Sequence, residues 1–453
     1  MGPSGGAVVR AVTTAARCPA IRVDARRLQM RVRAAPARDE LRPTKSPPQL
    51  SKRSDFPVMT CEFDLPAGTT SAAIRGRALK LPRAEPRRIV VIGDTGCRLK
   101  AADAAFQACD DPTAYPFARI TSQAAAWKPD LVVHVGDYLY RENPCPKTVP
   151  GCSGSPWGYG WDSWSADFFA PARPLLLAAP WIMVRGNHES CNRAGQGWWR
   201  FLDPRRLEPG RDCNDPRNDA LGDYQGAFLV PLGTDSQIVV MDIATSGEKA
   251  IAPGDPRFDQ LGGIWNFLKK TGANGKFTIA AGHYPLLALA AKAHDGVVGI
   301  GGESAGIASV FQAQDGPLVP PGIDLLLAGH VHLWEQVGFS RDYPTQLVAG
   351  FSGTQEDVAT LPAGLPIAVT PVAGASVAHF ASWTHGFGWM SLEKLGSRQW
   401  KVLVHSVTGG IVDQCQITGS TSICGLGAKR ESAGAPSARQ ARRESSQAGH
   451  RLR

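Results

Sequence analysis

The sequence predicts a fold of the mixed α/β (α+β) class, and three observations carry this prediction. Short apolar runs rich in β-branched residues alternate with helical patterns between Arg88 and Ala328. Five of these runs end in a glycine that is followed at once by Asp, Asn or His. From Leu347 to Ile417 the segments are strand-like, so β structure is expected to complete the fold.

The first strand is predicted at Arg88–Gly93 (RIVVIG). Helical patterns at Ala101–Cys109 and Phe117–Trp127 then lead to a buried strand at Asp130–Val135, which gives a βαβ unit. The segment Trp164–Ala178 reads as a further helix that tolerates a pair of prolines. Between the second strand and this helix, a loop rich in Gly, Pro and Trp at Asn143–Trp161 is expected to form the rim of a substrate pocket.

The second half of the chain repeats the alternation. Strands are predicted at Trp181–Arg185, Gln237–Asp242, Lys276–Ala281 and Asp324–Ala328. An amphipathic helix near Phe258–Lys270 separates two of them.

The positive charge of the chain is concentrated at its two ends. Met1–Arg53 carries 12 Lys/Arg against 3 Asp/Glu, and Lys429–Arg453 carries 7 against 2. Because the net charge of the whole chain is +9, the part between them, Ser54–Ala428, has a net charge of −5. A nucleic-acid footprint on the folded core is therefore not expected.

These differences predict three regions. Residues 1–55 are expected to be a disordered basic segment that includes a linker at Arg42–Gln49 (RPTKSPPQ). Residues 56–427 are expected to form one folded domain, and residues 428–453 a disordered basic tail. Prolines and a glycine argue against a membrane span in the uncharged stretch Leu365–Trp383.

The ten cysteines indicate the compartment. Eight of them form four close pairs, which are Cys97/Cys109, Cys145/Cys152, Cys191/Cys213 and Cys415/Cys424, whereas Cys18 and Cys61 have no assigned partner. Local pairs in polar loops favour disulfides and a periplasmic or secreted protein, with reduced buried thiols as the alternative. No secretory signal is recognisable, so we expect a misassigned start site; an organellar transit peptide is the other reading of the Arg-rich start.

The residues that follow the strand ends have metal-binding side chains. They are Asp94, Asp137, Asn187, His283 and His330, with Tyr140 and His332 close behind in the sequence. Each preceding glycine lets the chain turn sharply, so these side chains can approach a common point. Carboxylates, imidazoles and an amide oxygen suit iron or borderline divalent metals, and there are enough of them for two ions. Two such ions can stabilise the attacking and leaving oxygens of a displacement at phosphorus.

The ordered motifs GDTG, GDYLY, GNHE, GHYP and GHVH resemble the signature of the calcineurin-like metallophosphoesterases over Arg88–His332. Tyr140 and the Ala-Gly-His-Tyr-Pro stretch are most similar to the purple acid phosphatase branch. The resemblance implies a four-layer fold in which two packed mixed β-sheets are flanked by helices. The chain before Arg88 is too short for the separate β-sandwich domain of the plant-type enzymes, so a compact catalytic domain is expected.

The resemblance also implies a role for each motif residue. Asp94, Tyr140 and His332 would hold Fe(III), and Asn187, His283 and His330 would hold Zn(II), Fe(II) or Mn(II). Asp137 would bridge the two metal ions. A metal-bound hydroxide would attack phosphorus in line, and His188 would bind phosphate or protonate the leaving group. For Tyr140, packing over the site is the alternative to iron binding.

Two further residues, Glu189 and His294, have two readings each, and His134 has one. Glu189 would orient His188 or form a surface salt bridge, and His294 would meet the phosphate or be a solvated loop residue. His134, inside a strand, is expected to pack in the core.

The expected function is hydrolysis of small-molecule phosphate esters. Monoesters are favoured, so the expected activity is like that of an acid phosphatase. The alternatives are a phosphodiesterase of the same superfamily, acting on cyclic nucleotides, nucleotide conjugates or lipid headgroups, and a non-catalytic phosphate-binding scaffold.

Overall fold

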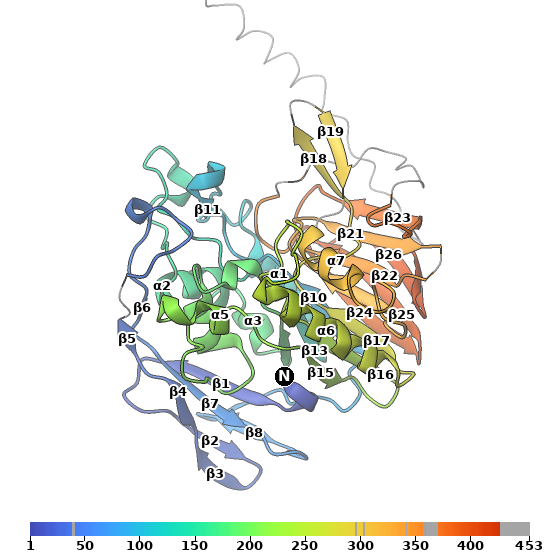
Figure 1. The fold of residues 1–453 in the computed structure, drawn as a ribbon. Coiled ribbons are helices and arrows are strands. Elements are labelled where there is room, and N and C mark those ends of the chain that lie inside the picture. Colours follow the sequence, from blue (N-terminus) through green and yellow to red (C-terminus); the bar gives the residue numbers. More distant parts are fainter. Residues whose placement is uncertain are drawn as a thin grey trace, which may run out of the picture.

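Two seven-stranded sheets form the centre of the protein (Figure 1). The computed structural model describes residues 1–38, 41–294, 297–301, 304–340, 342–356, 358 and 370–425. The first large sheet has the order β14 (Trp181–Met183), β13 (Leu131–His134), β10 (Arg88–Ile92), β24 (Gly388–Gly396), β25 (Gln399–Ser406), β26 (Ile411–Thr418) and β27 (Thr421–Ile423). The second has the order β15 (Phe228–Pro231), β16 (Ser236–Val240), β17 (Phe277–Ala281), β20 (Leu325–Ala328), β22 (Thr345–Ala349), β21 (Trp334–Phe339) and β23 (Val377–Trp383).

Alternate residues of the strands divide between two apolar environments. In β10 and β13, Val91 and Val133 face the second sheet, where they pack with residues such as Ile279 and Leu327. Their neighbours Val90 and Val132 belong to a different cluster on the outer face of the first sheet. Since successive strand side chains point to opposite faces, these strands are buried on both sides, which explains their continuous apolar sequences.

Helices cover the two outer faces. On the first sheet, α1 (Phe117–Ala126) contributes Phe117, Ile120 and Ala124 to the outer cluster. On the second sheet, α6 (Pro256–Gly272) and α7 (Ala305–Gln312) bury residues such as Trp265 and Phe311. The shorter helices are α2 (Trp161–Trp164), α3 (Arg173–Leu176), α4 (Gly195–Gly197) and α5 (Asp219–Gly222). The predicted arrangement of two mixed sheets between helices is confirmed.

One predicted helix is wrong, and another is irregular. Ala101–Cys109 carries the second strand of a short hairpin, β12 (Ala105–Phe106), which pairs with β11 (Leu99–Lys100), and the Cys97–Cys109 disulfide closes this hairpin. In Trp164–Ala178 a π-helical turn at Ser165–Phe169 separates α2 from α3, and Pro171 between them lacks the amide hydrogen that a continuous helix needs.

The prediction of disorder for residues 1–55 is also wrong for the residues that the structure describes. Strands β1 (Val8–Thr13), β2 (Ala20–Val23), β3 (Arg26–Gln29), β4 (Arg31–Ala34) and β5 (Ala37–Arg38) lie in this region. They pair with later strands β6 (Asp55–Phe56), β7 (Met59–Asp64), β8 (Ala72–Ile74) and β9 (Arg77–Ala78). The boundary expected at residue 56 therefore falls between strands that pair with each other. The tail at 428–453 lies outside the described residues.

The N-terminal strands form two small sheets, which we call the N-terminal β module. One sheet has the order β1-β7-β4, and the other has the order β3-β2-β8-β9. Apolar residues of both sheets, among them Ile21, Val23 and Phe63, share one cluster with the Cys18–Cys61 disulfide. Figure 1 places the module at the lower end of the molecule. A small β-sandwich thus precedes Arg88, contrary to the expectation that this segment is too short for one.

Five disulfides are formed among the ten cysteines. The four predicted local pairs are all present, and the fifth bond joins Cys18 to Cys61. No cysteine is left free. Five disulfides fit an extracellular or secreted protein. No described helix has the length and apolar character that a membrane crossing requires.

Thiol titration tests this arrangement. Protein from its native source, denatured without reductant, should show almost no free thiol, and all ten should appear after reduction. Because each disulfide restricts the unfolded chain, reduction should lower the free energy of unfolding by about 2–4 kcal/mol per bond. Detection of most of the ten thiols before reduction would contradict both the pairing and export.

Candidate dinuclear metal centre

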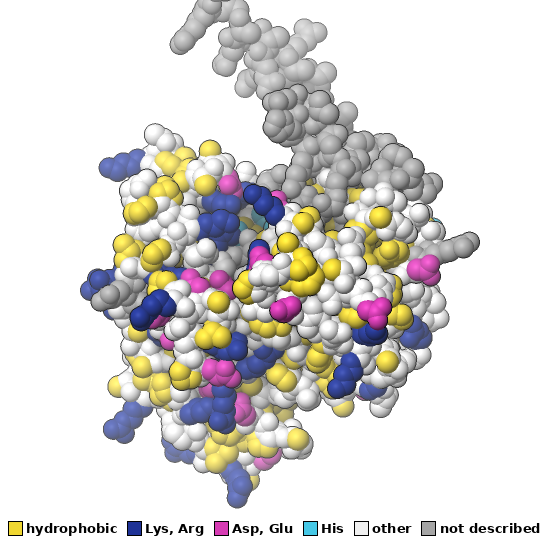
Figure 2. All heavy atoms as spheres, in the orientation of Figure 1, with side chains coloured by type: hydrophobic (Ala, Val, Ile, Leu, Met, Phe, Trp, Pro, Cys, Tyr) yellow, Lys and Arg dark blue, Asp and Glu magenta, His cyan; other side chains and the backbone are white. Residues whose placement is uncertain are grey.

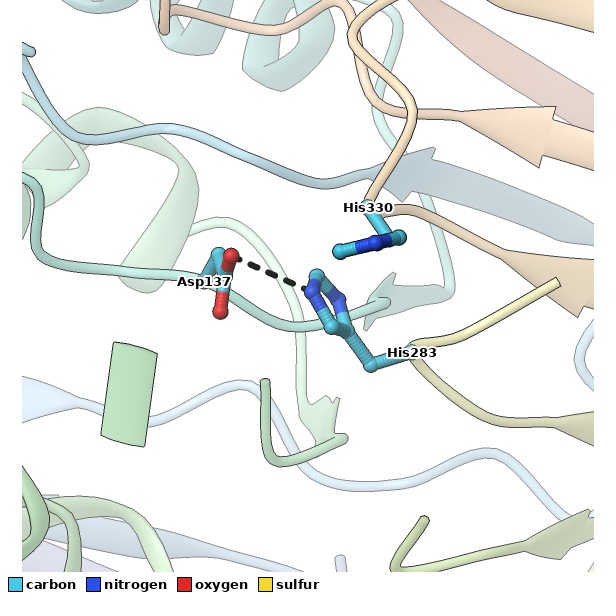
Figure 3. Close-up of side chains that lie close together, drawn as sticks. All are labelled: Asp137, His283 and His330. Carbon is cyan, nitrogen blue, oxygen red and sulfur yellow. Dashed lines mark ion pairs between the residues drawn. The ribbon is translucent and has the colours of Figure 1, made fainter. Parts of the chain in front are cut away.

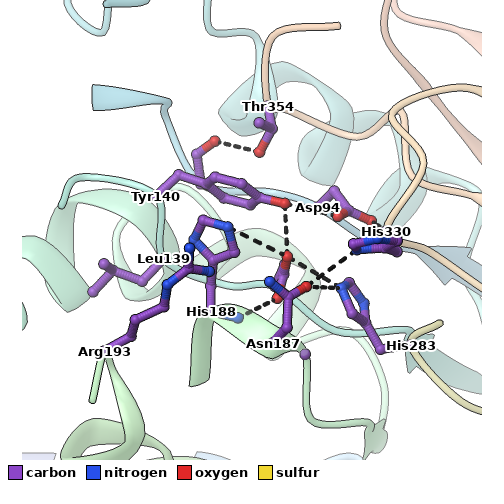
Figure 4. A network of polar contacts seen from close by, with 12 residues as sticks. Asp94, Leu139, Tyr140, Asn187, His188, Arg193, His283, His330 and Thr354 are labelled. Atoms are coloured by element: carbon purple, nitrogen blue, oxygen red, sulfur yellow. Dashed lines mark hydrogen bonds and ion pairs between the residues drawn. The ribbon is translucent and has the colours of Figure 1, made fainter. Parts of the chain in front are cut away.

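The carboxyl ends of five strands converge on one cluster of polar side chains (Figure 4). In the first sheet, Asp94 follows β10, Asp137 and Tyr140 follow β13, and Asn187 and His188 follow β14. In the second sheet, His283 follows β17, whereas His330 and His332 follow β20. The cluster therefore lies at the edge where the parallel strands of both sheets end, the usual ligand position in α/β folds.

The backbone at the cluster is bent in an unusual way. Asp94, Asp137 and His330 have φ values of 53°, 57° and 70°, in the left-handed region that non-glycine residues seldom occupy. A Cβ atom on Gly186 would lie 2.0 Å from Oδ1 of Asp137. Only glycine therefore allows the strand ends to approach this closely, and the strained positions coincide with the polar cluster.

The hydroxyl of Tyr140 lies among three hydrogen-bond acceptors. Its oxygen is 2.8 Å from Oδ1 of Asp94, 2.8 Å from Oδ2 of Asp137 and 2.9 Å from Nε2 of His332. Nδ1 of His332 faces the Gln355 carbonyl at 3.1 Å and has to donate to it, so Nε2 of the neutral ring presents a lone pair. A phenol has one hydrogen and cannot satisfy all three groups. A cation at this point would resolve the conflict.

The second half of the cluster centres on His283 (Figure 3). One ligand atom from each of Asp137, His283 and His330 lies within 4.8 Å of the others. Nδ1 of His283 is 2.8 Å from the Val135 carbonyl and donates to it, which leaves Nε2 facing Oδ2 of Asp137 at 3.1 Å. Burial lowers the pKa of His283, but the carboxylate of Asp137 more than offsets this and raises it to about 9. The position therefore favours a positive charge, from a proton or from a metal ion.

The amide of Asn187 can face this group in two ways. With Oδ1 turned inward, it lies 3.0 Å from Nε2 of His283 and 3.1 Å from Nδ1 of His330. With the amide reversed, its nitrogen would donate to these atoms and Oδ1 would accept from Arg193 at 3.0 Å. A metal ion between the rings requires the inward oxygen, whereas an empty cluster favours the reversed amide.

The donor set fits two cations. Asp94, Tyr140 and His332 surround one point, Asn187, His283 and His330 surround another, and Asp137 contacts members of both sets. Asp94, Asp137 and His283 are at most 1% exposed, so the negative charge of the carboxylates is held away from water. Buried carboxylates of this kind are stable when they are paired or bind metals.

His188 lies beside these sets, and its ring packs on the ring of Tyr140 with a centroid distance of 3.9 Å. Its Nδ1 is 2.8 Å from Oε1 of Glu142, and Nε2 is 3.8 Å from Oδ2 of Asp137. Burial raises the pKa of Glu142, but Arg193 and His188 together lower it to about 2, so Glu142 is a carboxylate. Glu142 therefore fixes the ring so that Nε2 points into the cluster.

The structure contradicts both expected readings of Glu189, the orientation of His188 and the surface salt bridge. Glu189 is fully buried and accepts hydrogen bonds from the backbone amides of Gly186, Asp137, Tyr138 and Leu139. Burial, and then the charge of Asp137, raise its pKa to about 8. Glu189 therefore holds together two of the loops that carry the cluster.

One known family has a sequence model that matches the part of the chain with these motifs. The model of the calcineurin-like phosphoesterases matches residues 87–333, which is more than half of the 453 residues. The chain belongs to this family. The matched region contains every residue of the cluster described above. No curated protein sequence matches the chain significantly.

Solved structures with this phosphoesterase fold include two informative neighbours. A purple acid phosphatase from seeds of yellow lupin (Lupinus luteus) aligns with a TM-score of 0.52 and 13% identity, over 94% of this chain and 72% of the other. A structure of PhoD aligns with a TM-score of 0.49 and 14% identity, over 82% of this chain and 81% of the other. At 13% identity, the likeness to the purple acid phosphatase describes the fold alone.

His134 takes no part in the cluster. His134 is fully buried, stacks on Tyr138 with a centroid distance of 3.8 Å and lies 3.0 Å from the hydroxyl of Thr95. Burial keeps its pKa well below the ordinary value, as expected for a packing residue. His294 ends strand β18 (Ala290–His294), which pairs with β19 (Val297–Gly301), but its side chain lies outside the described part of the structure.

Residues 42–49, predicted to be a linker, contact the neighbourhood of the phosphoesterase site. The amide of Lys45 donates to Asn192, five residues after Asn187, at 2.9 Å. Asn143, at the start of the predicted rim loop, donates to Ser46 at 2.8 Å and to the carbonyl of Leu50 at 3.1 Å. The N-terminal segment therefore packs against the loops that follow β13 and β14, which no local sequence pattern indicates.

Proposed function

We propose that this chain is a dinuclear-metal phosphatase that hydrolyses phosphate monoesters. The arrangement around Tyr140 carries the proposal, because its single hydroxyl lies within 2.9 Å of three acceptor groups. Membership of the calcineurin-like phosphoesterases supports a hydrolase of phosphate esters. The deep burial of the cluster supports an ester with one substituent, since a second substituent on phosphorus would need further space beside the site.

In this proposal, Asp94, Tyr140 and His332 would hold Fe(III), and Asn187, His283 and His330 would hold Zn(II), Fe(II) or Mn(II). Asp137 would contribute to both sites. The phenolic oxygen and carboxylates of the first set favour the harder ion, whereas the imidazoles and amide of the second suit a borderline divalent ion. When bound, the two ions supply an activated water and stabilise the charge that develops at phosphorus.

The protein's own contribution is to orient groups and to move one proton. His188 presents Nε2 toward the cluster because Glu142 contacts Nδ1 at 2.8 Å. We propose that Nε2 donates a proton to the leaving oxygen of the substrate. Burial and Arg193 lower the pKa of His188 to about 4, and Asp137 and Glu142 oppose this shift, so Glu142 favours the protonated ring. Glu189 keeps the loops before Asn187 and after Asp137 together through their backbone amides. The five disulfides support a periplasmic or secreted location.

The substrate class is tested with a matched pair of aryl esters. An aryl phosphate monoester should give a kcat/KM at least about tenfold higher than the corresponding bis-aryl diester. A strong chelator should abolish both activities, and added iron with a divalent ion should restore them. Faster turnover of the diester would assign the protein to the phosphodiesterases, and no turnover of either ester by metal-loaded protein would favour a scaffold.

Tyr140→Phe tests the iron assignment. A phenolate bound to Fe(III) absorbs visible light by charge transfer, so the loaded wild-type protein should be coloured and the variant should lose this band. The fold should persist because only one hydroxyl is removed. Tyr138→Phe is the matched control: its hydroxyl donates to the Val184 carbonyl at 3.0 Å and makes no described hydrogen bond to a proposed metal ligand. A colourless wild-type protein that contains iron would show that Tyr140 only packs over the site.

A further inference from the structure

The outer face of one N-terminal sheet carries a group of arginines. Arg22 on β2 lies opposite Arg27 on β3 and opposite Ala73 on β8. Arg75 lies in the turn that follows β8, with a φ of 48°, and lines the same surface cleft as Arg22 and Arg27. The intervening residues of the strands, such as Ile21 and Ile74, pack in the core of the module. The three arginines therefore stand on the solvent side, and all three are exposed.

These arginines line an open cleft with a volume of about 430 Å³. The rest of its wall consists of Pro19, Ala20, Ile21, Ala73 and Gly76. The small residues form a floor that leaves the guanidinium groups accessible. The sheet lies at the lower end of the molecule in Figure 1, and Figure 2 shows Lys and Arg side chains at that end.

The three positive charges have no counter-charge in the part of the chain that the structure describes. None of Arg22, Arg27 and Arg75 forms an ion pair there, although Arg10, Arg31 and Arg33 on the other small sheet all contact Glu62. The nearby Asp24 accepts hydrogen bonds from the backbone amides of Thr70 and Ser71 instead. Like charges on directly opposed strand residues are destabilising, so an unpaired group of this kind indicates an anionic ligand.

The chemistry of the cleft restricts that ligand. No aromatic side chain lines it, so stacking of a base or a sugar ring is not available. Guanidinium groups bind phosphate and sulfate through paired N–H donors, and three of them can hold more than one such group. The basic excess of residues 1–53, which the sequence placed in a disordered segment, lies largely on this folded module.

We propose that the cleft binds an oligoanion, a ligand that carries two or more phosphate or sulfate groups close together. This proposal does not depend on the proposed phosphatase activity, since the residues of the cleft and those of the metal cluster are separate. A condensed inorganic phosphate and a sulfated oligosaccharide share the required chemistry, and the two probes below distinguish them.

Isothermal titration calorimetry with the full chain tests the proposal. The probes are a sulfated hexasaccharide, and tripolyphosphate in an Asp137→Asn background so that hydrolysis does not consume it. The variant Arg22→Ala/Arg27→Ala/Arg75→Ala should bind the preferred probe about 10- to 100-fold more weakly. Because the contacts are exposed, a rise in salt from about 0.05 M to 0.5 M should also weaken binding by the wild type.

A charge-matched variant provides the control. Arg38→Ala/Arg206→Ala/Arg217→Ala removes the same charge from side chains that are 74%, 77% and 89% exposed and lie outside the cleft. It should retain wild-type affinity. Equal weakening in both variants would show attraction by net charge alone, and absence of binding of either probe to the wild type would overturn the proposal. Thermal unfolding of both variants verifies that the module remains folded.

Discussion

Replacing Asp137 by asparagine should lower kcat/KM for an aryl phosphate by about 10³-fold or more, with loss of bound metal. Asp137 contacts Tyr140 at 2.8 Å and His283 at 3.1 Å, and so is shared by both sets of ligands. The amide keeps the size of the side chain but replaces a charged oxygen with an N–H donor, which repels a cation. Metal analysis and steady-state kinetics on the same preparation measure both effects.

The control for Asp137 is a carboxylate outside the cluster. Asp162 is 49% exposed and pairs with Lys52 at 2.9 Å, so Asp162→Asn should leave the metal content and kcat/KM unchanged. Near-ultraviolet circular dichroism of Asp137→Asn should match the wild type, because the substitution is isosteric. An Asp137→Asn protein with full metal content and full turnover would end the dinuclear assignment.

The second large effect is expected for His188→Asn. Loss of the proton donor should lower kcat by about 10²–10⁴-fold for an alkyl phosphate, whose leaving oxygen needs a proton. The loss should be much smaller for 4-nitrophenyl phosphate, because that leaving group departs as a stable anion. KM should change little if His188 acts mainly in the transition state. The comparison of the two substrates separates a proton donor from a residue that only binds phosphate.

The variants Glu142→Gln and Glu189→Gln test whether the two buried glutamates near His188 have different roles. Glu142 contacts Nδ1 of His188, so its loss should lower kcat by about 10- to 100-fold and show the same dependence on the leaving group. Glu189 binds only backbone amides in the contacts described, so Glu189→Gln should reduce stability and metal content without that dependence. The opposite pattern would return the orienting role to Glu189.

If His188→Asn lowers kcat by the same factor for the alkyl and the aryl ester, His188 is not the proton donor.

The cluster could be located from sequence because its information is local. Each strand end carries its own glycine and its own metal-binding side chain, and parallel strands bring such ends to one edge of the sheets. The core strands were also predictable because both faces of these strands are buried. Val90 packs on one face and Val91 on the other, so the strand sequence is continuously apolar.

The partner of His188 was not predictable in this way. Glu189 is its neighbour in sequence, but the 3₁₀ turn at Asn187–Glu189 directs the two side chains apart. Glu142 is 46 residues from His188 and reaches it only because β13 and β14 are adjacent in the sheet. The clue in the sequence was its place at the end of the GDYLYRE stretch, where Glu142 is the fourth acidic or phenolic residue after β13.

The N-terminal β module was missed for a different reason. Its strands are short and carry arginines on the solvent face, so the amino-acid composition of the module resembles that of a disordered segment. Their order depends on pairing between distant segments, such as Val8 with Asp64, and on a disulfide between residues 43 positions apart. Likewise, the alanine-rich helix predicted at 101–109 gave way to a disulfide-closed hairpin. Non-local bonds overrode local preference in both regions.

The position of β7 at the centre of its sheet limits where this protein can be shortened. A chain that began at residue 56 would lack β1 and β4, and β7 would expose both of its hydrogen-bonding edges. Glu62 would lose its three arginine partners, and Cys61 would carry a free thiol. Unpaired edges promote strand addition between molecules, and an exposed thiol promotes cross-linking. Such a chain would be prone to aggregate even though every proposed metal ligand is still present.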